Sequence, residues 1–263
     1  MTLAQALAAA GLEPREARLL LAAAAGLPEA SVLAHPQRPL SPEAERRFAA
    51  LAERRRAGEP VAYLLGRKEF YGLELEVDAA VLIPRPETEL LVELALARPF
   101  ASVLDLGTGS GAIALALKRH RPHARVVAVD SSAAALALAR RNAQRLGLQV
   151  ELRQGHWLQA ASGERYEAIV SNPPYVAMGD PHLPALRHEP PAALLGGADG
   201  LDAIREIAAC APGHLAPGGS LLLEHGLGQA PAVRALLRQA GFAHARTWPD
   251  LAGIARVTVA TVE

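Results

Sequence analysis

One stretch of sequence decides the fold: Asp105-Leu106-Gly107-Thr108-Gly109-Ser110-Gly111. It lies between the apolar pair Val103-Leu104 and a helical segment. Glycines at these positions let the backbone turn tightly and approach a ligand without interference from a Cβ atom. The spacing is Gly-x-Gly-x-Gly, which differs from the Gly-x-Gly-x-x-Gly of dinucleotide-binding folds. The stretch therefore predicts a strand, a ligand-binding turn and a helix, in that order.

The same alternation of strand, turn and helix continues to the end of the chain. Apolar runs that fit strands are residues 103–106, 126–130, 168–170 and 220–224, and helices are expected at 111–120, 132–146 and 201–215. Continuous apolar strands separated by helices indicate a parallel sheet covered on both faces. Residues 255–262 alternate in polarity and suit a final antiparallel strand. The sequence predicts a doubly wound, mostly parallel α/β fold.

The N-terminal part has a different pattern. Residues 1–57 fit helices, and Ser41-Pro42 has the composition of a helix start. Residues 58–89 are rich in turn formers and suggest a hairpin followed by a loop, with a helix starting near Glu87. We expect three segments: a helical domain (1–70), a hairpin or linker (71–90) and an α/β domain (91–263).

Composition narrows the possible partners. The 263 residues include 27 Lys+Arg and 27 Asp+Glu, and residues 1–78 carry ten basic and eleven acidic side chains. Nucleic-acid binders usually have a basic surplus, so stable nucleic-acid binding is not expected and a protein partner is favoured. The N-terminus does not resemble a signal peptide, and no apolar run is long enough to suggest a membrane span. We expect a soluble cytoplasmic monomer.

Two acidic residues refine the ligand expected at the glycine turn. Asp130 ends the next strand, 19 residues beyond Gly111, and could accept hydrogen bonds from both ribose hydroxyls. Asp105 would repel a pyrophosphate, but it suits a positive ammonium group such as the methionine end of S-adenosyl-L-methionine. The alternative is an ordinary glycine turn with a structural aspartate. The strand, acid and helix context favours the cofactor interpretation.

A second motif, Asn172-Pro173-Pro174-Tyr175, follows the strand that ends at Ser171. An amide nitrogen is a poor nucleophile because its lone pair is delocalised into the carbonyl. The Asn172 side-chain oxygen and the Pro173 carbonyl could accept hydrogen bonds from one NH₂, while Tyr175 provides a flat wall for a planar substrate. A rigid turn that caps a strand is the alternative. Its position after the glycine motif favours a catalytic and substrate-binding loop that works mainly by positioning.

Other aromatic and histidine residues carry weaker signals. Trp157 follows a third probable strand and could stack on adenine, although a core tryptophan is equally plausible from sequence. His156 is expected at the surface. His188 and His225 lack a Ser or Cys partner at a recognisable spacing, so structural roles are expected for them. No His and carboxylate pair has metal-ligand spacing, and no metal is predicted.

Taken in order, further motifs carry a resemblance to a known family. They are Gly66-Arg67-Lys68-Glu69-Phe70-Tyr71-Gly72, Ile83-Pro84-Arg85-Pro86-Glu87-Thr88-Glu89, the two motifs above, Glu189-Pro190, Gly196-Gly197-Ala198-Asp199-Gly200-Leu201 and Glu224-His225-Gly226. Together they resemble the HemK/PrmC family, the glutamine N5-methyltransferases of class-1 peptide chain release factors. The segment from Pro84 to Glu89 is more specific than Asn-Pro-Pro-Tyr, which DNA adenine and some RNA guanine methyltransferases share.

The resemblance implies a fold, a cofactor and a substrate. It implies the seven-stranded, Rossmann-like sheet of class I methyltransferases, and a release factor docked with help from the N-terminal domain. It implies that Asn172 to Tyr175 hold the glutamine of a Gly-Gly-Gln tip, and that S-adenosyl-L-methionine binds Gly107 to Gly111, Asp130, Trp157 and Asn172. Two positions depart from the family pattern: His156, where relatives often have an acid, and Ile254-Ala255.

Two other function classes remain as alternatives. A methyltransferase acting on an exocyclic base amine could use Asn172 in the same way, but it needs a basic groove for a flipped base. The neutral N-terminal part and the lack of an inserted recognition domain argue against it. A non-catalytic binding module or an oxidoreductase is opposed by the paired motifs and by the glycine spacing.

Overall fold

The computed structural model describes residues 1–263, which divide into two compact units, Met1–Arg67 and Lys68–Glu263. The division falls at the first residue of a hairpin made of β1 (Arg67–Phe70) and β2 (Leu73–Glu76). The boundary expected after residue 70 therefore lies inside this hairpin. Phe70, Leu73 and Leu75 are buried in the core of the larger unit, which explains why the hairpin belongs to it.

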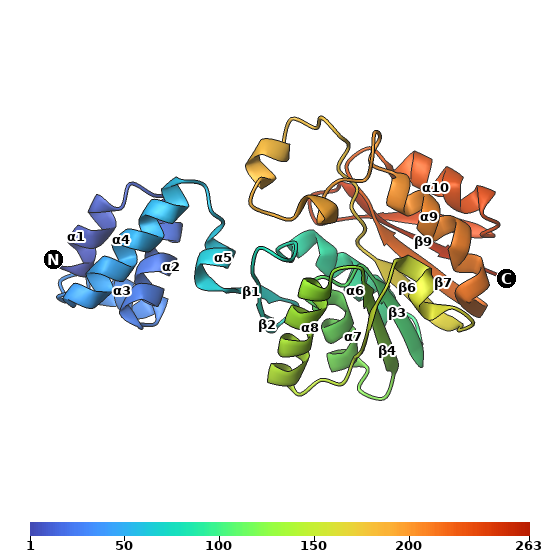
Figure 1. The fold of residues 1–263 in the computed structure, drawn as a ribbon, viewed down its shortest axis with the longest axis horizontal. Helices are drawn as coiled ribbons and strands as arrows, with labels where there is room; N and C mark the ends of the chain where they lie inside the picture. Colours follow the sequence, from blue (N-terminus) through green and yellow to red (C-terminus); the bar gives the residue numbers. More distant parts are fainter. The chain divides into compact units, whose positions relative to one another are not determined.

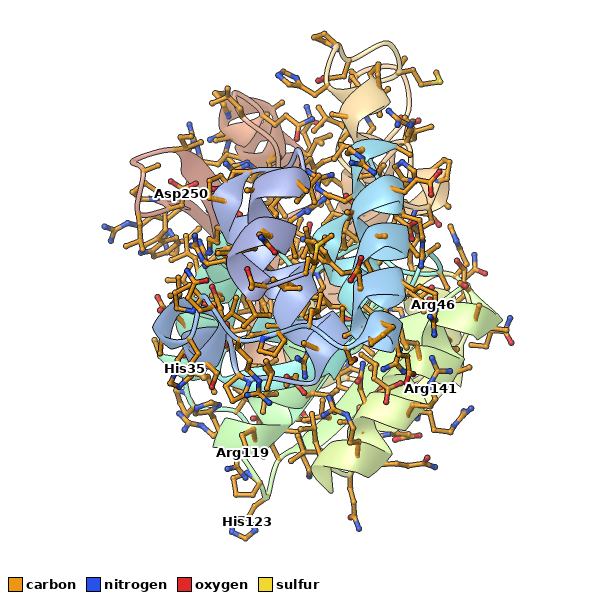
Figure 2. The ribbon with its side chains drawn as sticks, turned by 90° about the vertical axis from the view of Figure 1, so that its left-hand side faces the viewer. His35, Arg46, Arg119, His123, Arg141 and Asp250 are labelled. Carbon is orange, nitrogen blue, oxygen red and sulfur yellow. The ribbon has the colours of Figure 1, made fainter.

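The smaller unit is a cluster of five helices: α1 (Leu3–Ala9), α2 (Pro14–Ala25), α3 (Glu29–Ala34), α4 (Pro42–Arg56) and α5 (Val61–Leu65). Ser41 caps α4 as expected, because its hydroxyl accepts a hydrogen bond from the Ala44 amide at 3.2 Å. Leu20, Leu21 and Phe48 are buried in a core of this unit's own residues. Figure 2 shows His35 and Arg46 of this unit among its outward-facing side chains.

The larger unit contains a seven-stranded sheet with the order β5-β4-β3-β6-β7-β9-β8. Its strands are β3 (Ser102–Leu106), β4 (Arg125–Asp130), β5 (Glu151–Gln154), β6 (Tyr166–Ser171), β7 (Leu215–Glu224), β8 (His244–Pro249) and β9 (Ala255–Thr261). The first five are parallel, and β9 pairs antiparallel with β7 and β8. The predicted doubly wound, mostly parallel sheet is confirmed.

Helices cover both faces of this sheet (Figure 1). One layer contains α6 (Glu89–Leu96), α7 (Ala112–His120) and α8 (Ala133–Leu146), and the other contains α9 (Asp202–Cys210) and α10 (Ala230–Gln239). Alternate residues of each strand enter opposite cores: Val103 packs into the first, whereas Leu104 packs into the second. Burial on both faces explains why the central strands are continuously apolar.

Two details differ from the sequence-based expectations. The helix expected over 201–215 ends at Cys210 and continues as a 3-10 turn, Ala211–His214, because Pro212 cannot donate a helical hydrogen bond. Strand β8 was not expected, because its half-exposed residues lack a clear apolar run. Other 3-10 turns are Pro86–Thr88, Trp157–Ala161, Leu183–Leu186 and Pro191–Ala193. None of the helices has the length and apolar character needed to cross a membrane.

Candidate active site at the carboxyl edge of the sheet

The candidate site lies where the winding of the sheet reverses. From β3 the chain proceeds outward to β4 and β5, then returns to β6 on the other side of β3. The parallel register pairs Leu106 with Ser171, so the loops that follow these two residues leave the sheet side by side. Ligands of open α/β sheets bind at this type of switch point. The topology therefore brings the glycine turn and the Asn172 loop together.

The glycine turn is fixed by backbone hydrogen bonds to the neighbouring strand. The amides of Gly107 and Thr108 both donate to the Val129 carbonyl, at 2.8 and 3.0 Å. Gly107 has φ +72° and Gly109 has φ +56°, a backbone region that favours glycine. A Cβ atom at Gly107 would lie 3.2 Å from the Trp157 ring, whereas one at Gly109 would meet nothing within 4 Å. The turn needs glycine for its conformation at both positions and for close packing at one.

Asp130 holds the turn from the end of β4. Its Oδ2 accepts from the Gly109 amide at 2.8 Å, and its Oδ1 accepts from the Ser132 amide at 2.9 Å. Ser132 in turn caps α8 by accepting from the Ala135 amide at 3.2 Å. Each carboxylate oxygen has a further lone pair, so Asp130 can anchor the turn and still accept hydrogen bonds from a ligand.

Asp105 lies fully buried beneath the turn. Its Oδ2 accepts a 2.6 Å hydrogen bond from the Thr108 hydroxyl, while its Oδ1 has no partner. Burial raises the pKa of Asp105 to about 7, because a charged carboxylate is poorly solvated there. A buried acid with one unpartnered oxygen is unusual for a purely structural residue and suits a position next to a cationic group.

Trp157 and His156 form the wall beside the turn. Trp157 is half-buried, packs its ring over Gly107 and has φ +43°, a strained conformation for a tryptophan. The ring lines the site and is also packed, half-buried, against the second hydrophobic core. His156 is exposed, as expected, and its Nε2 lies 3.0 Å from Glu206 Oε2 on α9.

On the other side of the site, Asn172 follows β6. Its Nδ2 donates a 3.0 Å hydrogen bond to the Thr88 hydroxyl, which leaves Oδ1 as the free end of the amide. Pro173 is buried and Pro174 is half-buried. Thr88 belongs to the Pro84–Glu89 motif, and the sequence alone indicated no separate role for it. Its side-chain contact with Asn172 spans 84 positions, which no local pattern could reveal.

Tyr175 turns toward the interior of the unit. Its hydroxyl donates to Glu224 Oε1 at 3.2 Å, and burial raises the pKa of the phenol. Its backbone carbonyl accepts from Gln229 Nε2 at 3.0 Å. Glu224 is fully buried, and desolvation raises its pKa to about 7. The tyrosine thus ties the Asn172 loop to the end of β7.

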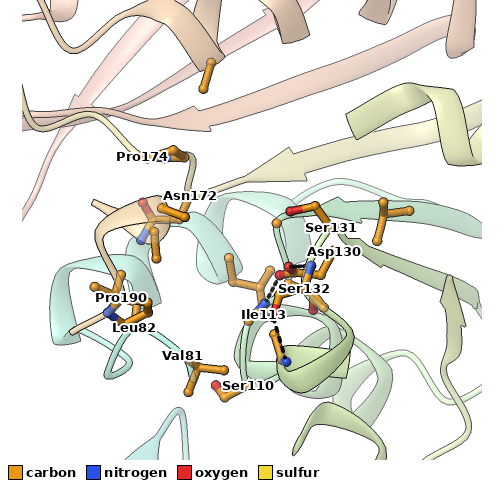
Figure 3. Close-up of a pocket in the computed structure, with 18 of the residues that line it drawn as sticks. Val81, Leu82, Ser110, Ile113, Asp130, Ser131, Ser132, Asn172, Pro174 and Pro190 are labelled. Carbon is orange, nitrogen blue, oxygen red and sulfur yellow. Dashed lines mark hydrogen bonds between the residues drawn. The ribbon is translucent and has the colours of Figure 1, made fainter. Parts of the chain in front are cut away.

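One cavity of about 490 Å³ joins the two loops. That volume lies within the roughly 300–1,000 Å³ typical of small-molecule sites. Of the site residues expected from sequence, the cavity is lined by Gly107, Thr108, Gly109, Ser110, Asp130, Trp157, Asn172 and Pro174, but not by Asp105, Gly111, Pro173 or Tyr175. Figure 3 shows Asp130, Ser131 and Ser132 on one side of the cavity and Asn172, Pro174 and Pro190 on another.

Several lining residues were not singled out by sequence reasoning. Phe70, Val81, Leu82, Ile113 and Leu195 add apolar surface. The charged lining residues are one arginine, Arg85, and three acids, Asp130, Asp202 and Glu206. Arg85 is already paired with the buried Glu189, which also accepts from the Ile83 amide at 3.0 Å. The cavity therefore has no surplus of positive charge.

The remaining histidines lie outside this cavity. His225 is fully buried, with Nε2 3.0 Å from the Thr258 hydroxyl, and burial lowers its pKa. His188 has an unpartnered, buried Nε2. No group of three or more His, Cys, Asp or Glu side chains is arranged to hold a metal ion.

The fold and site define a class of protein: a methyltransferase with the mostly parallel seven-stranded sheet of class I. Residues 86–188 match the family described as Methyltransferase small domain, and residues 2–66 match the PrmC N-terminal domain. A solved methyltransferase from Pyrococcus furiosus shares the fold with a TM-score of 0.59 and 19% identity, over 80% of this chain and 98% of that one.

Similarity to curated relatives is much stronger. A release factor glutamine methyltransferase of Xylella fastidiosa is 52% identical over 94% of this chain and 93% of its own length. A release factor glutamine methyltransferase of Pseudomonas aeruginosa is 53% identical over 93% of this chain and 91% of its own length. The chain belongs to the release factor glutamine methyltransferase family, and the HemK/PrmC resemblance is confirmed.

Proposed function

We propose that this protein transfers a methyl group from S-adenosyl-L-methionine to the side-chain amide nitrogen, N5, of the glutamine in the Gly-Gly-Gln motif of class-1 peptide chain release factors. The observation that carries the proposal is the Asn172 side chain in the cavity. Because its Nδ2 is engaged by Thr88, its Oδ1 is available to accept from a substrate NH₂.

The residues at the glycine end of the cavity fit the proposed cofactor. Asp130 has lone pairs for ribose hydroxyls, and Trp157 presents an aromatic ring for adenine. Asp105 has an unpartnered buried oxygen beneath the turn, which suits the ammonium group of a methionine end. Gly109 has free space where a Cβ atom would be, so a ligand can approach the backbone. The same residues offer no basic side chain for a pyrophosphate.

At the other end, the chain's task is to position a weak nucleophile. S-adenosyl-L-methionine supplies an activated methyl group when it is bound. Asn172 Oδ1 and the Pro173 carbonyl accept from the two N–H bonds of the glutamine amide and hold the nitrogen in line with that methyl. A bond forms between nitrogen and the methyl carbon, the bond from carbon to sulfur breaks, and one N–H proton is released. Positioning of this kind can supply much of the rate enhancement.

The helical unit, Met1–Arg67, is proposed to help dock the release factor. Its nine arginines are nearly balanced by seven glutamates, and so small a surplus suits a protein partner better than a nucleic acid. We propose that the enzyme acts as a monomer in the cytoplasm, where release factors work.

The competing function is methylation of an exocyclic amine on a nucleic-acid base. A 16S rRNA N2 G1207 methyltransferase from Thermus thermophilus, solved with AdoMet and guanosine, resembles this chain with a TM-score of 0.54 and 25% identity. The charges of the cavity oppose this function, because one paired arginine faces three acids. Exposed basic groups such as Arg119 and His123 project from the end of α7 that leads into β4, at the opposite edge of the sheet (Figure 2).

The deciding experiment is incubation with methyl-labelled S-adenosyl-L-methionine and either a class-1 release factor, the same factor with its Gly-Gly-Gln glutamine replaced by alanine, or DNA. We expect label only on the intact factor. Label on DNA, or on the altered factor, would contradict the proposal. As a binding control, S-adenosyl-L-methionine should raise the Tm and NADH should not, because only a ligand of the native state stabilises it.

A further inference from the structure

The Asn172 loop, residues 172–175, needs support from outside because of its own composition. Pro173 and Pro174 have no backbone N–H, so neither residue can donate a hydrogen bond that would anchor the loop. Over these two residues the backbone can be held only by donors to its carbonyls and by packing against it. The proposed chemistry assigns no role to the glycines of two other motifs, residues 196–201 and 224–226, and both motifs meet this loop.

The Gln229 side chain, just before α10, joins the loop to both motifs. Its Oε1 accepts from the Gly226 amide at 2.7 Å. Its Nε2 donates to the Tyr175 carbonyl at 3.0 Å and to the Gly200 carbonyl at 3.3 Å. A backbone amide can only donate and a backbone carbonyl can only accept, so the orientation of the Gln229 amide is fixed at both ends.

Two glycines let the backbone of residues 196–201 lie directly against the backbone of the loop. A Cβ atom at Gly196 would lie 2.5 Å from the Pro174 carbonyl oxygen, and one at Gly200 would overlap the Tyr175 carbonyl oxygen. Both separations are closer than non-bonded atoms can approach, and both glycines are buried. Any larger residue at either position must displace the loop or its support.

Backbone hydrogen bonds extend this contact beyond the loop. The Val176 amide donates to the Leu194 carbonyl at 2.8 Å, and the Gly196 amide donates to the Val176 carbonyl at 2.9 Å. The supporting segment is itself anchored, because Leu201 packs into the second hydrophobic core. The loop therefore rests on a segment that is fixed to the interior of the unit.

We propose that Gln229, Gly196 and Gly200 are positioning residues that fix the backbone of the Asn172 loop for catalysis. None of the three lines the cavity, so each acts through the loop. The identity of the amide that the loop holds rests on the proposed function, but the support of the loop does not. A reaction that depends on positioning is sensitive to small shifts, since a displacement of about 1 Å can lower a rate on the order of 100-fold.

The first test compares Gly196→Ala with Gly213→Ala. Neither glycine has a positive φ, so neither substitution strains the backbone. Only the Cβ at position 196 meets the loop, because one at Gly213 would meet nothing within 4 Å. We expect kcat on intact release factor to fall at least about tenfold in Gly196→Ala and to stay within about twofold of the wild type in Gly213→Ala.

Gly200→Ala and Gly253→Ala form a second matched pair. The two glycines have nearly the same positive φ, +77° and +79°, so the two substitutions introduce similar backbone strain. A Cβ at Gly253 would meet nothing within 4 Å, whereas one at Gly200 would overlap the loop. The kcat of Gly200→Ala should fall at least about tenfold, and that of Gly253→Ala should stay within about twofold of the wild type.

Gln229→Glu tests the hydrogen bond and keeps the size of the side chain. The variant retains an acceptor for the Gly226 amide, but it turns a second oxygen toward the Tyr175 and Gly200 carbonyls in place of the donor. We expect kcat to fall roughly tenfold. Gln239→Glu makes the same change on an exposed residue at the end of α10 and is the control.

The cofactor Kd separates positioning from a general loss of structure. It should stay within about twofold of the wild type in Gly196→Ala, Gly200→Ala and Gln229→Glu, because the glycine turn and Asp130 are untouched. The inference is overturned if kcat in these folded variants equals that of their controls, or if the cofactor Kd rises as much as kcat falls. Should the alanine variants fail to fold, Gln229→Glu still decides.

A measurement without substrate distinguishes this inference from the proposed function. Amide hydrogen exchange in the peptide that contains Val176 reports local opening of the loop from its support. Exchange should be several-fold faster in Gly196→Ala and Gln229→Glu than in Gly213→Ala and Gln239→Glu. Equal exchange in all four variants would refute the support of the loop. Failure of the wild type to label a release factor would refute only the proposed substrate.

Discussion

The two loops of the site are held in different ways. The glycine turn is fixed by backbone amides that donate to Val129 and Asp130 on the adjacent strand. The Asn172 loop is fixed by side chains from distant segments: Thr88, Gln229 and Glu224. Each loop also lies above one buried acid with a pKa raised to about 7, Asp105 under the first and Glu224 under the second.

The difference separates two tasks. A cofactor shared by many enzymes can be bound by a local strand, turn and helix, whose geometry is encoded by glycines and one acid. An amide substrate requires one oxygen at one place, and here the loop that carries that oxygen is held by contacts of Asn172 and Tyr175 that span 84 and 49 positions along the chain. We therefore expect changes in the first loop to alter binding and changes in the second to alter turnover.

The largest expected effect is on turnover in Asn172→Ala. Because the amide oxygen is proposed to act most strongly in the transition state, kcat should fall about a hundredfold or more. The cofactor Kd should change little, since the glycine turn and Asp130 remain. Steady-state kinetics on intact release factor with saturating cofactor provides the measurement. Turnover in Asn172→Ala equal to that of the wild type would show that this loop takes no part in catalysis.

Asn172→Asp sharpens the same comparison. It keeps an acceptor and the shape, but it places a negative charge near the sulfonium, which loses its charge as the methyl is transferred. We expect a partial loss of kcat, smaller than in Asn172→Ala. Activity equal to that of the wild type would show that acceptor strength alone matters.

Asp130→Ala should act on binding. A charge-assisted hydrogen bond contributes about 1.5–3 kcal/mol, so the cofactor Kd should rise roughly 10- to 150-fold. The Tm should also fall, because the Gly109 and Ser132 amides lose their acceptor. Calorimetric titration and a thermal melt measure the two effects. A changed Tm with an unchanged Kd would assign Asp130 a structural role only.

Gly107→Ala and Gly109→Ala form a matched pair within the glycine turn. Both positions have positive φ, so both substitutions cost roughly 1–2 kcal/mol of backbone strain. Only Gly107→Ala also pushes a Cβ toward the Trp157 ring, at 3.2 Å. Gly109→Ala instead places its Cβ in the space proposed for the ligand. We therefore expect the larger loss of Tm in Gly107→Ala and the larger increase in cofactor Kd in Gly109→Ala. Equal losses of Tm would show that packing of the tryptophan is unimportant.

The smallest expected effect is a pH-dependent stability change from Asp105. Its pKa is raised from the ordinary 3.8 to about 7, so between about pH 4 and pH 7 the native state holds a proton that the unfolded chain has lost. The contribution of Asp105 to the free energy of unfolding therefore falls as the pH rises through that window. Asp105→Asn should gain a few degrees of Tm relative to the wild type between pH 5 and pH 8. A difference in Tm between Asp105→Asn and the wild type that stays constant over this pH range would mean that Asp105 does not titrate there.

Much of the architecture was predictable from the sequence, for identifiable reasons. The central strands are continuously apolar, and Ser41 and Pro42 mark the start of α4. Strand β8 was missed because edge strands bury little and show no strong pattern. The boundary expected after residue 70 falls within the hairpin, because the burial of Phe70 depends on helices that come later in the chain.

The sequence by itself determined the strand, glycine turn and helix, the acid at the end of β4 and the Asn172 motif, because each is encoded by neighbouring residues. Only the tertiary structure decided that two loops 65 residues apart share one cavity, since parallel pairing of Leu106 with Ser171 sets their distance. It also decided which end of the Asn172 amide is free. That depends on Thr88, which lies 84 positions away along the chain and meets Asn172 only when the sheet and its helices pack.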